Sequence, residues 1–125
     1  SVIFFTGGGP NKATENFSSY ALSKFLFIKF AELLNKEDKK INFTCINPGW
    51  VKTKAHDIFL KQKIKSNSFV DPKLTTDFFS WFYKKKNKKY SGKYYVVDFD
   101  KFNDIKFNKK ILNYSDIYTM RRKEK

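Results

Sequence analysis

Two short apolar segments, each ended by glycine, constrain the fold of this chain more than any other feature. Residues 2–6 form a continuous apolar run followed by three glycines, and residues 41–47 form a second, largely apolar run that ends at Pro48-Gly49. Such runs are typical of strands buried on both faces of a parallel sheet. Because proline cannot continue a central strand, the second run is expected to end in a chain reversal beside a ligand. The intervening residues 19–35 are long enough for the helix that a parallel connection requires.

The predicted helix over residues 19–35 carries a tyrosine and a lysine four positions apart. Tyr20 and Lys24 are expected to share one face of the helix, because residues i and i+4 are neighbours there. An ammonium beside a phenol favours the ionised phenol, which makes Tyr20 a candidate proton donor or acceptor. Alone, the pair also fits an aromatic- and lysine-rich helix without a catalytic role. The apolar residues of this helix cover more than one face, so we expect it to pack on the sheet and on a second subunit.

The order of these motifs resembles the C-terminal half of the short-chain dehydrogenase/reductase family. The family pattern is a strand, a hydroxyl residue, a Tyr-x-x-x-Lys helix, a second strand and Pro-Gly-x-Val-x-Thr; residues 46–53 here read Ile-Asn-Pro-Gly-Trp-Val-Lys-Thr. Residues 115–122 are similar to the ending of a bacterial branch that also carries Gly-Gly-Gly after the strand. The resemblance implies an α/β fold, the C-terminal half of a doubly wound parallel-sheet (Rossmann-type) domain with about three strands and flanking helices.

The resemblance also implies an activity and the residues that perform it. The family transfers hydride between a nicotinamide cofactor, NAD or NADP, and a small carbonyl or secondary-alcohol substrate. Tyr20 would be the general acid/base, Lys24 would assist it and bind the nicotinamide ribose, and the Thr6 hydroxyl would hold the carbonyl oxygen. The count back to the family's serine falls on Gly7, one position after Thr6, so the third catalytic position is open. The implied cofactor contacts are Tyr20, Lys24, Pro48, Gly49, Val51 and Thr53. By the same resemblance, the helix over residues 19–35 builds a homodimer or tetramer.

The sequence contains no pyrophosphate-binding turn and no residue that selects between NAD and NADP. The run Gly7-Gly8-Gly9-Pro10 lacks the Gly-x-Gly-x-x-Gly spacing, and Pro10 removes a backbone donor. The chain also opens inside an apolar strand without an initiator methionine. We therefore interpret residues 1–125 as a partial domain, the catalytic half of a parent enzyme whose nucleotide-binding N-terminal half is missing. Alone, it is expected to be inactive and prone to aggregation, because its first strand exposes a pairing edge.

The remaining segments are assigned from local signals. Residues 54–67 are predicted to form a lid over the substrate, with a short helix at about residues 57–65. A helix is expected from Asp71-Pro72 to about residue 86, followed by a strand over residues 93–99. Residues 100–125 are expected to form an irregular tail on the surface.

The chain is strongly basic, with 26 Lys and Arg against 12 Asp and Glu and a net charge of +14. Such a charge can attract nucleic acid or an anionic surface. The basic residues are spread along the chain, however, and the dense run at residues 84–89 is interpreted as a solvated helix end, so no nucleic-acid partner is expected. Two alternatives stay open: a non-catalytic descendant of the same fold, and a basic protein that binds nucleic acid or another anion.

The single cysteine, Cys45, cannot form an internal disulfide, which fits a reducing, cytoplasmic location. Neither Cys45 nor the single histidine, His56, has further ligands at metal-binding spacing, so no metal site is expected. No apolar run is long enough to span a bilayer, and no membrane partner is expected.

Overall fold

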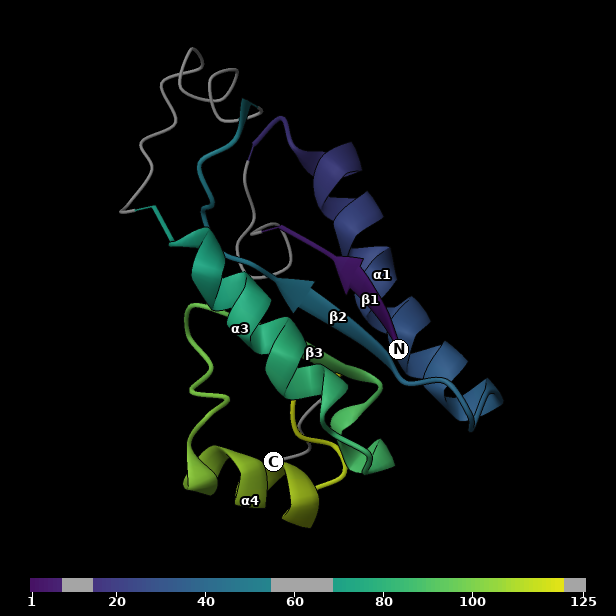
Figure 1. Cartoon of the computed structure of the whole chain (residues 1–125). Coiled ribbons are helices and arrows are strands. Elements are labelled where there is room, and N and C mark those ends of the chain that lie inside the picture. Colours follow the sequence, from purple (N-terminus) through teal and green to yellow (C-terminus); the bar gives the residue numbers. More distant parts are fainter. Residues whose placement is uncertain (8–14, 55–68, 121–125) are drawn as a thin grey trace, which may run out of the picture.

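The computed structural model describes residues 1–7, 15–54 and 69–120 of the chain. These residues form three strands, three α-helices and one short 3₁₀-helix, shown in Figure 1. In chain order the elements are β1 (Val2–Phe5), α1 (Ser18–Glu37), β2 (Phe43–Asn47), α3 (Pro72–Tyr83), η2 (Lys88–Tyr90), β3 (Lys93–Val96) and α4 (Ile105–Asn113).

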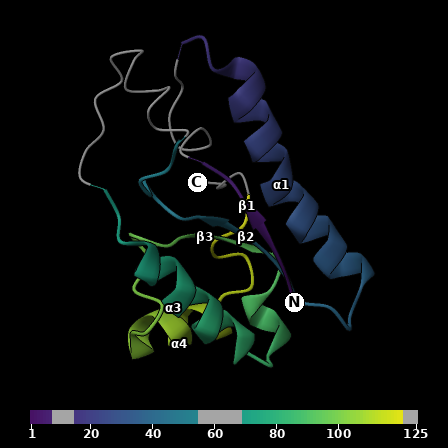
Figure 2. The same cartoon turned by 45° about the horizontal axis from the view of Figure 1, so that its top comes forward.

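The three strands form one parallel sheet in the order β1-β2-β3. In its register, Phe4 lies beside Cys45 and Cys45 beside Tyr94. Helix α1 covers one face of the sheet, whereas α3 and α4 lie on the other (Figure 2). The predicted α/β class, with parallel strands and flanking helices, is therefore confirmed. The narrower Rossmann-type interpretation stays a prediction.

The two faces of the sheet carry separate apolar clusters, because successive strand residues point in opposite directions. Cys45 belongs to the cluster beneath α1, and its neighbour Ile46 to the cluster beneath α3 and α4; both are fully buried. The cluster beneath α1 comprises Ile28, Ala31, Phe43 and Cys45. The opposite cluster is larger and mainly aromatic, comprising Ile46, Phe78, Trp81, Phe82, Tyr90, Tyr95, Val97, Phe102, Phe107 and Ile111.

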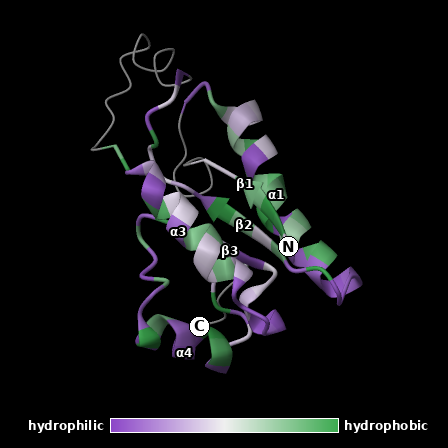
Figure 3. Ribbon diagram, viewed as in Figure 1, coloured by the Kyte–Doolittle hydropathy of each residue, from purple (hydrophilic) through white to green (hydrophobic). Residues whose placement is uncertain are grey.

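The C-terminal part of the chain differs from the predicted irregular tail. Helix α4 occupies residues 105–113, and the Asp104 side chain caps it by accepting a hydrogen bond from the Lys106 backbone N–H at 2.7 Å. Phe107 and Ile111, four positions apart, are 8% and 0% exposed. Figure 3 shows how strongly hydrophilic residues are mixed with the hydrophobic ones along this helix. The prediction was wrong because most residues of α4 are polar, although Phe107, Ile111 and Leu112 follow the helical spacing that places them on one face.

Residues 114–120, here called the C-terminal strap, follow α4 and cover the outer edge of β3. The Tyr94 N–H donates a hydrogen bond of 2.8 Å to the carbonyl oxygen of Tyr118. The Tyr118 ring packs against Phe107, with centroids 5.3 Å apart, on one face of the sheet. Met120 packs on the cluster beneath α1, on the other face. The strap therefore joins both layers, whereas no described strand lies beside the outer edge of β1.

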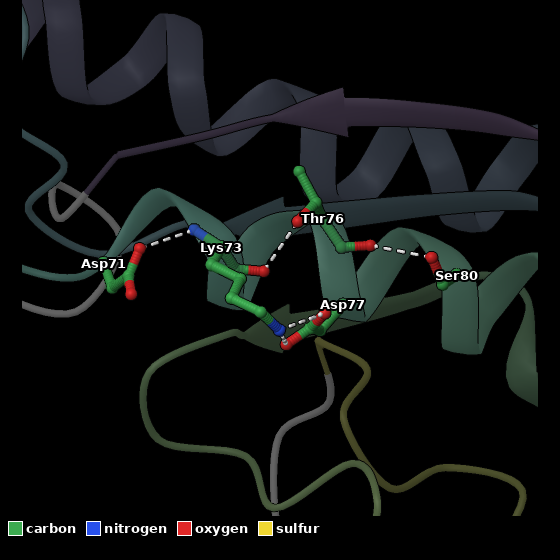
Figure 4. Close-up of polar contacts among 5 residues, drawn as sticks. All are labelled: Asp71, Lys73, Thr76, Asp77 and Ser80. Atoms are coloured by element: carbon green, nitrogen blue, oxygen red, sulfur yellow. Dashed lines mark hydrogen bonds and ion pairs between the residues drawn. The ribbon is translucent and has the colours of Figure 1, made fainter.

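Several predicted boundaries are too wide, and one predicted segment lies outside the described residues. The helix expected to reach residue 86 ends at Tyr83, and the strand expected over residues 93–99 ends at Val96. Helix α3 begins as predicted beside Pro72, with the Asp71 side chain accepting the Lys73 N–H at 2.8 Å (Figure 4). The predicted lid helix at residues 57–65 falls outside the described part of the chain.

Candidate functional site

The carboxyl ends of β1 and β2 lie side by side, since the strands are parallel neighbours with Phe5 beside Ile46. Strand β1 leads into Thr6-Gly7, and β2 leads into Pro48-Gly49. The carboxyl edge of a parallel sheet is where ligands bind in open α/β folds. The motifs singled out in the sequence thus emerge at one edge of the sheet.

Tyr20, in the first turn of α1, lies against the backbone of Gly7. A Cβ atom placed on Gly7 would lie 2.4 Å from the Tyr20 Oη and 3.3 Å from its Cζ. The Tyr20 ring packs edge-on against Phe17, with centroids 6.3 Å apart at 87°. Tyr20 is nevertheless 41% exposed, so its phenol borders both the end of β1 and solvent.

Lys24 follows Tyr20 by one helical turn and lies on the same side of α1. Its Nζ is 5.7 Å from the centroid of the Tyr20 ring and 5.7 Å from that of Phe27. These distances are within the range of a cation–π contact. The ammonium therefore faces the π-surface of the phenol, and the predicted adjacency of the two residues is confirmed.

Thr6 is buried, with 6% of its surface exposed, and is fastened to β2. Its backbone N–H donates to the Ile46 carbonyl oxygen at 2.7 Å, and its Oγ1 donates to the same oxygen at 3.3 Å. The structure places Thr6 at the carboxyl edge, as predicted. In this arrangement, however, the hydroxyl proton is directed to the backbone of β2 and not to a substrate oxygen.

The turn after β2 is closely packed around Gly49, which has a φ of +77°. A Cβ on Gly49 would lie 2.7 Å from the Val70 Cγ2 and 2.9 Å from the Asp98 Cγ. The backbone continues through a tight turn in which the Val51 N–H donates to the Gly49 carbonyl at 3.1 Å. Gly49 therefore has to be a glycine, both for its conformation and for the approach of its neighbours.

The remaining predicted cofactor contacts lie along the same turn. Pro48 and Val51 are half-buried, whereas Thr53 is exposed. The Val51 N–H is already engaged in the tight turn, so it is not available in this arrangement as a donor to a cofactor.

Asp98 is a residue of this edge that the sequence analysis missed. It follows β3, whose end is joined to β2 by a hydrogen bond of 2.8 Å from the Val97 N–H to the Asn47 carbonyl. Its carboxylate lies against Gly49. Asp98 was missed because the strand was predicted to extend over residues 93–99, which placed Asp98 within it. A carboxylate directly after the apolar pair Val96-Val97 was the local signal that the strand had ended.

Cys45, beneath α1, is a structural residue and not a nucleophile. Burial raises the pKa of its thiol from 9.0 to about 12, against smaller opposing effects of the Ile46 backbone N–H and the Lys24 ammonium. The thiol is fully buried in the cluster beneath α1. It therefore stays protonated near neutral pH and does not take part in chemistry at the carboxyl edge.

Two shallow hollows lie elsewhere on the described surface. One, of about 280 Å³, lies at the amino edge of the sheet and is bordered by Lys88, Lys89 and Lys93. The Nζ of each of these lysines donates to a backbone carbonyl, those of Ile41, Leu112 and Ser115 respectively. The three ammonium groups are therefore already hydrogen-bonded to the backbone of the chain.

The other hollow, of about 300 Å³, lies beside α3 and is bordered by Asp77 and Ser80. Asp77 pairs with Lys73 at 2.8 Å, and the Ser80 hydroxyl donates to the Thr76 carbonyl at 3.1 Å (Figure 4). The Asp77 carboxylate and the Ser80 hydroxyl are thus already bound within α3.

No protein-family model matches the chain, and no curated protein is significantly similar to it. The resemblance to short-chain dehydrogenases/reductases therefore depends on the residues and their arrangement alone. Within the described ranges, no three His, Cys, Asp or Glu side chains are grouped so that they could hold a metal ion, and His56 falls outside those ranges. No described helix combines the length and apolar character needed to cross a membrane.

Proposed function

We propose that this chain is the catalytic half of a Rossmann-type short-chain dehydrogenase/reductase domain that interconverts a carbonyl and a secondary alcohol with NAD or NADP. The observation that carries the proposal is the contact of Tyr20 with Gly7 at the end of β1, beside the carboxyl end of β2. This contact brings a helical Tyr-x-x-x-Lys pair to the sheet edge at which α/β folds bind ligands. Composition alone gives no reason for that placement.

In the proposed reaction the nicotinamide would supply or accept the hydride, and a side chain of this protein transfers the proton. The hydroxyl of the partly exposed Tyr20 donates its proton to the developing alkoxide during reduction and takes it back during oxidation. The Lys24 ammonium, held over the ring, stabilises the negative charge left on the phenol.

By the resemblance, the nicotinamide end of the cofactor would lie at the turn after β2, along Pro48, Gly49, Val51 and Thr53. Because Val70 and Asp98 fill the space beside Gly49, the cofactor would have to approach this turn from its other side. The described residues supply no glycine-rich turn for the pyrophosphate, so the proposal assigns that role to a nucleotide-binding half paired with β1. Support comes from β1 itself: Val2 and Phe5 are 38% and 45% exposed in a strand that is wholly apolar.

Self-association through α1 is part of the same proposal. One side of α1 packs on the sheet through Ile28 and Ala31, which are 4% and 0% exposed. The other side presents apolar side chains to solvent: Leu22, Phe25, Leu26, Phe30 and Leu33. An apolar face of this kind favours a homodimer or tetramer in which α1 meets its counterpart.

One observation favours the alternative of a non-catalytic descendant. The Thr6 hydroxyl donates to the Ile46 carbonyl, whereas holding a substrate oxygen would require that proton to be redirected. If the third catalytic group is absent, the same fold would serve assembly and not catalysis.

The coding DNA upstream of Ser1 tests the proposal first. We expect an in-frame Thr-Gly-x-x-x-Gly-x-Gly segment, followed by an acidic residue for NAD or a basic residue for NADP. The encoded protein should oxidise NADH or NADPH in the presence of small aldehydes or ketones, and Tyr20→Phe should lower kcat by about 10²-fold or more. Tyr83→Phe, at an exposed tyrosine of α3, is the matched control and should leave kcat unchanged. A start codon immediately before the codon of Ser1, or an unchanged kcat in Tyr20→Phe, would refute the proposal.

A further inference from the structure

We propose that Gly7 is a positioning residue of the candidate site, because the absence of a side chain at this position sets where the Tyr20 hydroxyl lies. The effect of Gly7 on catalysis rests on the proposed function. Its effect on the position of the Tyr20 hydroxyl does not depend on that function. Counting back from Tyr20, Gly7 occupies the position of the family's catalytic serine. The question is therefore whether the site has lost a catalytic hydroxyl or gained a glycine that positions Tyr20.

The Gly7 side of the contact is fixed by the residue before it. The Thr6 N–H and Oγ1 both donate to the Ile46 carbonyl oxygen, at 2.7 Å and 3.3 Å, which fastens the end of β1 to β2. Gly7 is the next residue and is itself half-buried. Moving its Cα away from Tyr20 would strain or break these two hydrogen bonds.

The Tyr20 side is fixed by α1. The ring lies between the edge contact with Phe17 and the Lys24 ammonium, and the Ala21 N–H donates to the Phe17 carbonyl at 2.8 Å. The helix that carries the ring is anchored on the sheet by its buried residues Ile28 and Ala31. The backbone that carries Tyr20 is therefore held in place, and the phenol could move away from Gly7 only by rotation of its side chain, which would give up the contacts with Phe17 and Lys24.

With the Tyr20 ring in its observed orientation, there is no room for a side chain at position 7. A Cβ at position 7 would lie 2.4 Å from the Tyr20 Oη, far closer than two such atoms approach in proteins. Serine, like every residue except glycine, carries a Cβ, so a serine at position 7 would displace the phenol. Gly7 is therefore compatible with this placement of Tyr20 where serine is not, and Thr6 is the hydroxyl residue left at the end of β1.

A double-mutant cycle tests the contact directly in this chain. Without the Tyr20 hydroxyl, the nearest ring atoms lie 3.3 Å and 3.5 Å from the added Cβ, which a small ring movement accommodates. Gly7→Ala should therefore lower the urea midpoint in the original chain and lower it much less in the Tyr20→Phe background. The cycle cancels the effect of alanine on the unfolded chain, which is common to both backgrounds. Equal shifts in the two backgrounds would overturn the proposal.

A second measurement covers variants that are too unstable for unfolding curves. With 3-fluorotyrosine placed at position 20, Gly7→Ala should shift the ¹⁹F resonance, whereas Ser19→Ala, at the exposed neighbour of Tyr20, should not. An unchanged resonance in Gly7→Ala would also overturn the proposal.

Kinetics of the full-length protein separate this inference from the proposed function. If the protein reduces carbonyls, Gly7→Ala should lower kcat at least tenfold with little change in KM, because misplacing a catalytic group by about 1 Å can cost 10²-fold. An active protein whose kcat is unaffected would refute the positioning role. If no form of the protein is active, the proposed function fails, and the double-mutant cycle alone decides whether Gly7 positions Tyr20.

Discussion

The Nζ of Lys93 lies 2.8 Å from the carbonyl oxygen of Ser115 and donates a hydrogen bond to it. A second bond of 2.8 Å runs from the same Nζ to the Ile117 carbonyl. Lys93 opens β3 and is 3% exposed, so a buried ammonium fastens the C-terminal strap to the edge of the sheet. Burial lowers the pKa of this ammonium, while the nearby Asp116 and Glu32 carboxylates act in the opposite direction.

Replacing Lys93 by methionine should release the strap. The substitution keeps an unbranched apolar stem but leaves the Ser115 and Ile117 carbonyls without their charged donor, which we expect to cost about 2–4 kcal/mol of unfolding free energy. Urea unfolding measures the cost, and hydrogen exchange at the Tyr94 N–H, which the strap protects, should accelerate. Lys109→Met, at an exposed position of α4, is the control and should change little. Equal stabilities of the two variants would show that the strap does not depend on Lys93.

Removing the Phe107 ring tests whether α4 is part of the core. The ring lies 6.1 Å from Trp81 and 5.3 Å from Tyr118, between centroids. Phe107→Ala should lower the unfolding free energy by about 3–5 kcal/mol, the range for buried aromatic rings. Ile105→Ala, at a position of the same helix that is 73% exposed, should cost far less. If both variants are equally mild, α4 is not a core element.

The sequence was sufficient for elements with strong local signals. Continuous apolar runs identified β1 and β2, and the turn residues Pro48 and Gly49 marked the end of β2 because their backbone restrictions are local. Helix α4 was missed because most of its residues are polar, although Phe107 and Ile111 lie four positions apart, as on one face of a helix. Its cap, Asp104, was the available local signal.

The geometry of the candidate site was less predictable than its composition. Spacing along one helix was enough to place Tyr20 near Lys24, since both belong to the same rigid element. The contact of Tyr20 with Gly7 depends instead on how α1 packs on β1, and no local pattern encodes that distance. The hydrogen bond from Thr6 to the Ile46 carbonyl likewise could not be predicted from local sequence, because it joins segments that are far apart along the chain.

Charge placed on the exposed side of α1 should reduce self-association. Leu22 and Leu26 are 60% and 59% exposed and lie one turn apart, so the double substitution Leu22→Lys and Leu26→Lys would bury two ammonium groups in any α1–α1 interface. Sedimentation velocity at increasing protein concentration should show a shift toward the monomer. Tyr83→Lys, at an 81% exposed position of α3, is the control and should associate like the original chain. Unchanged association in the double variant would place the interface elsewhere.

Alkaline pH should destabilise the chain through Cys45. The thiol pKa is raised by burial from 9.0 to about 12, so between these values the unfolded chain loses this proton while the folded chain keeps it. The stability contributed by the protonated thiol is thus complete below pH 9.0 and is lost as the pH rises toward 12, at up to about 1.4 kcal/mol per pH unit. Cys45→Ala lacks this term, so its unfolding free energy should fall less steeply over the same interval, whatever constant cost its smaller side chain carries. At pH 8, a thiol reagent should modify Cys45 in the original chain only as fast as the protein unfolds. Rapid labelling of the folded protein, or parallel pH profiles for the two chains, would contradict a thiol buried beneath α1.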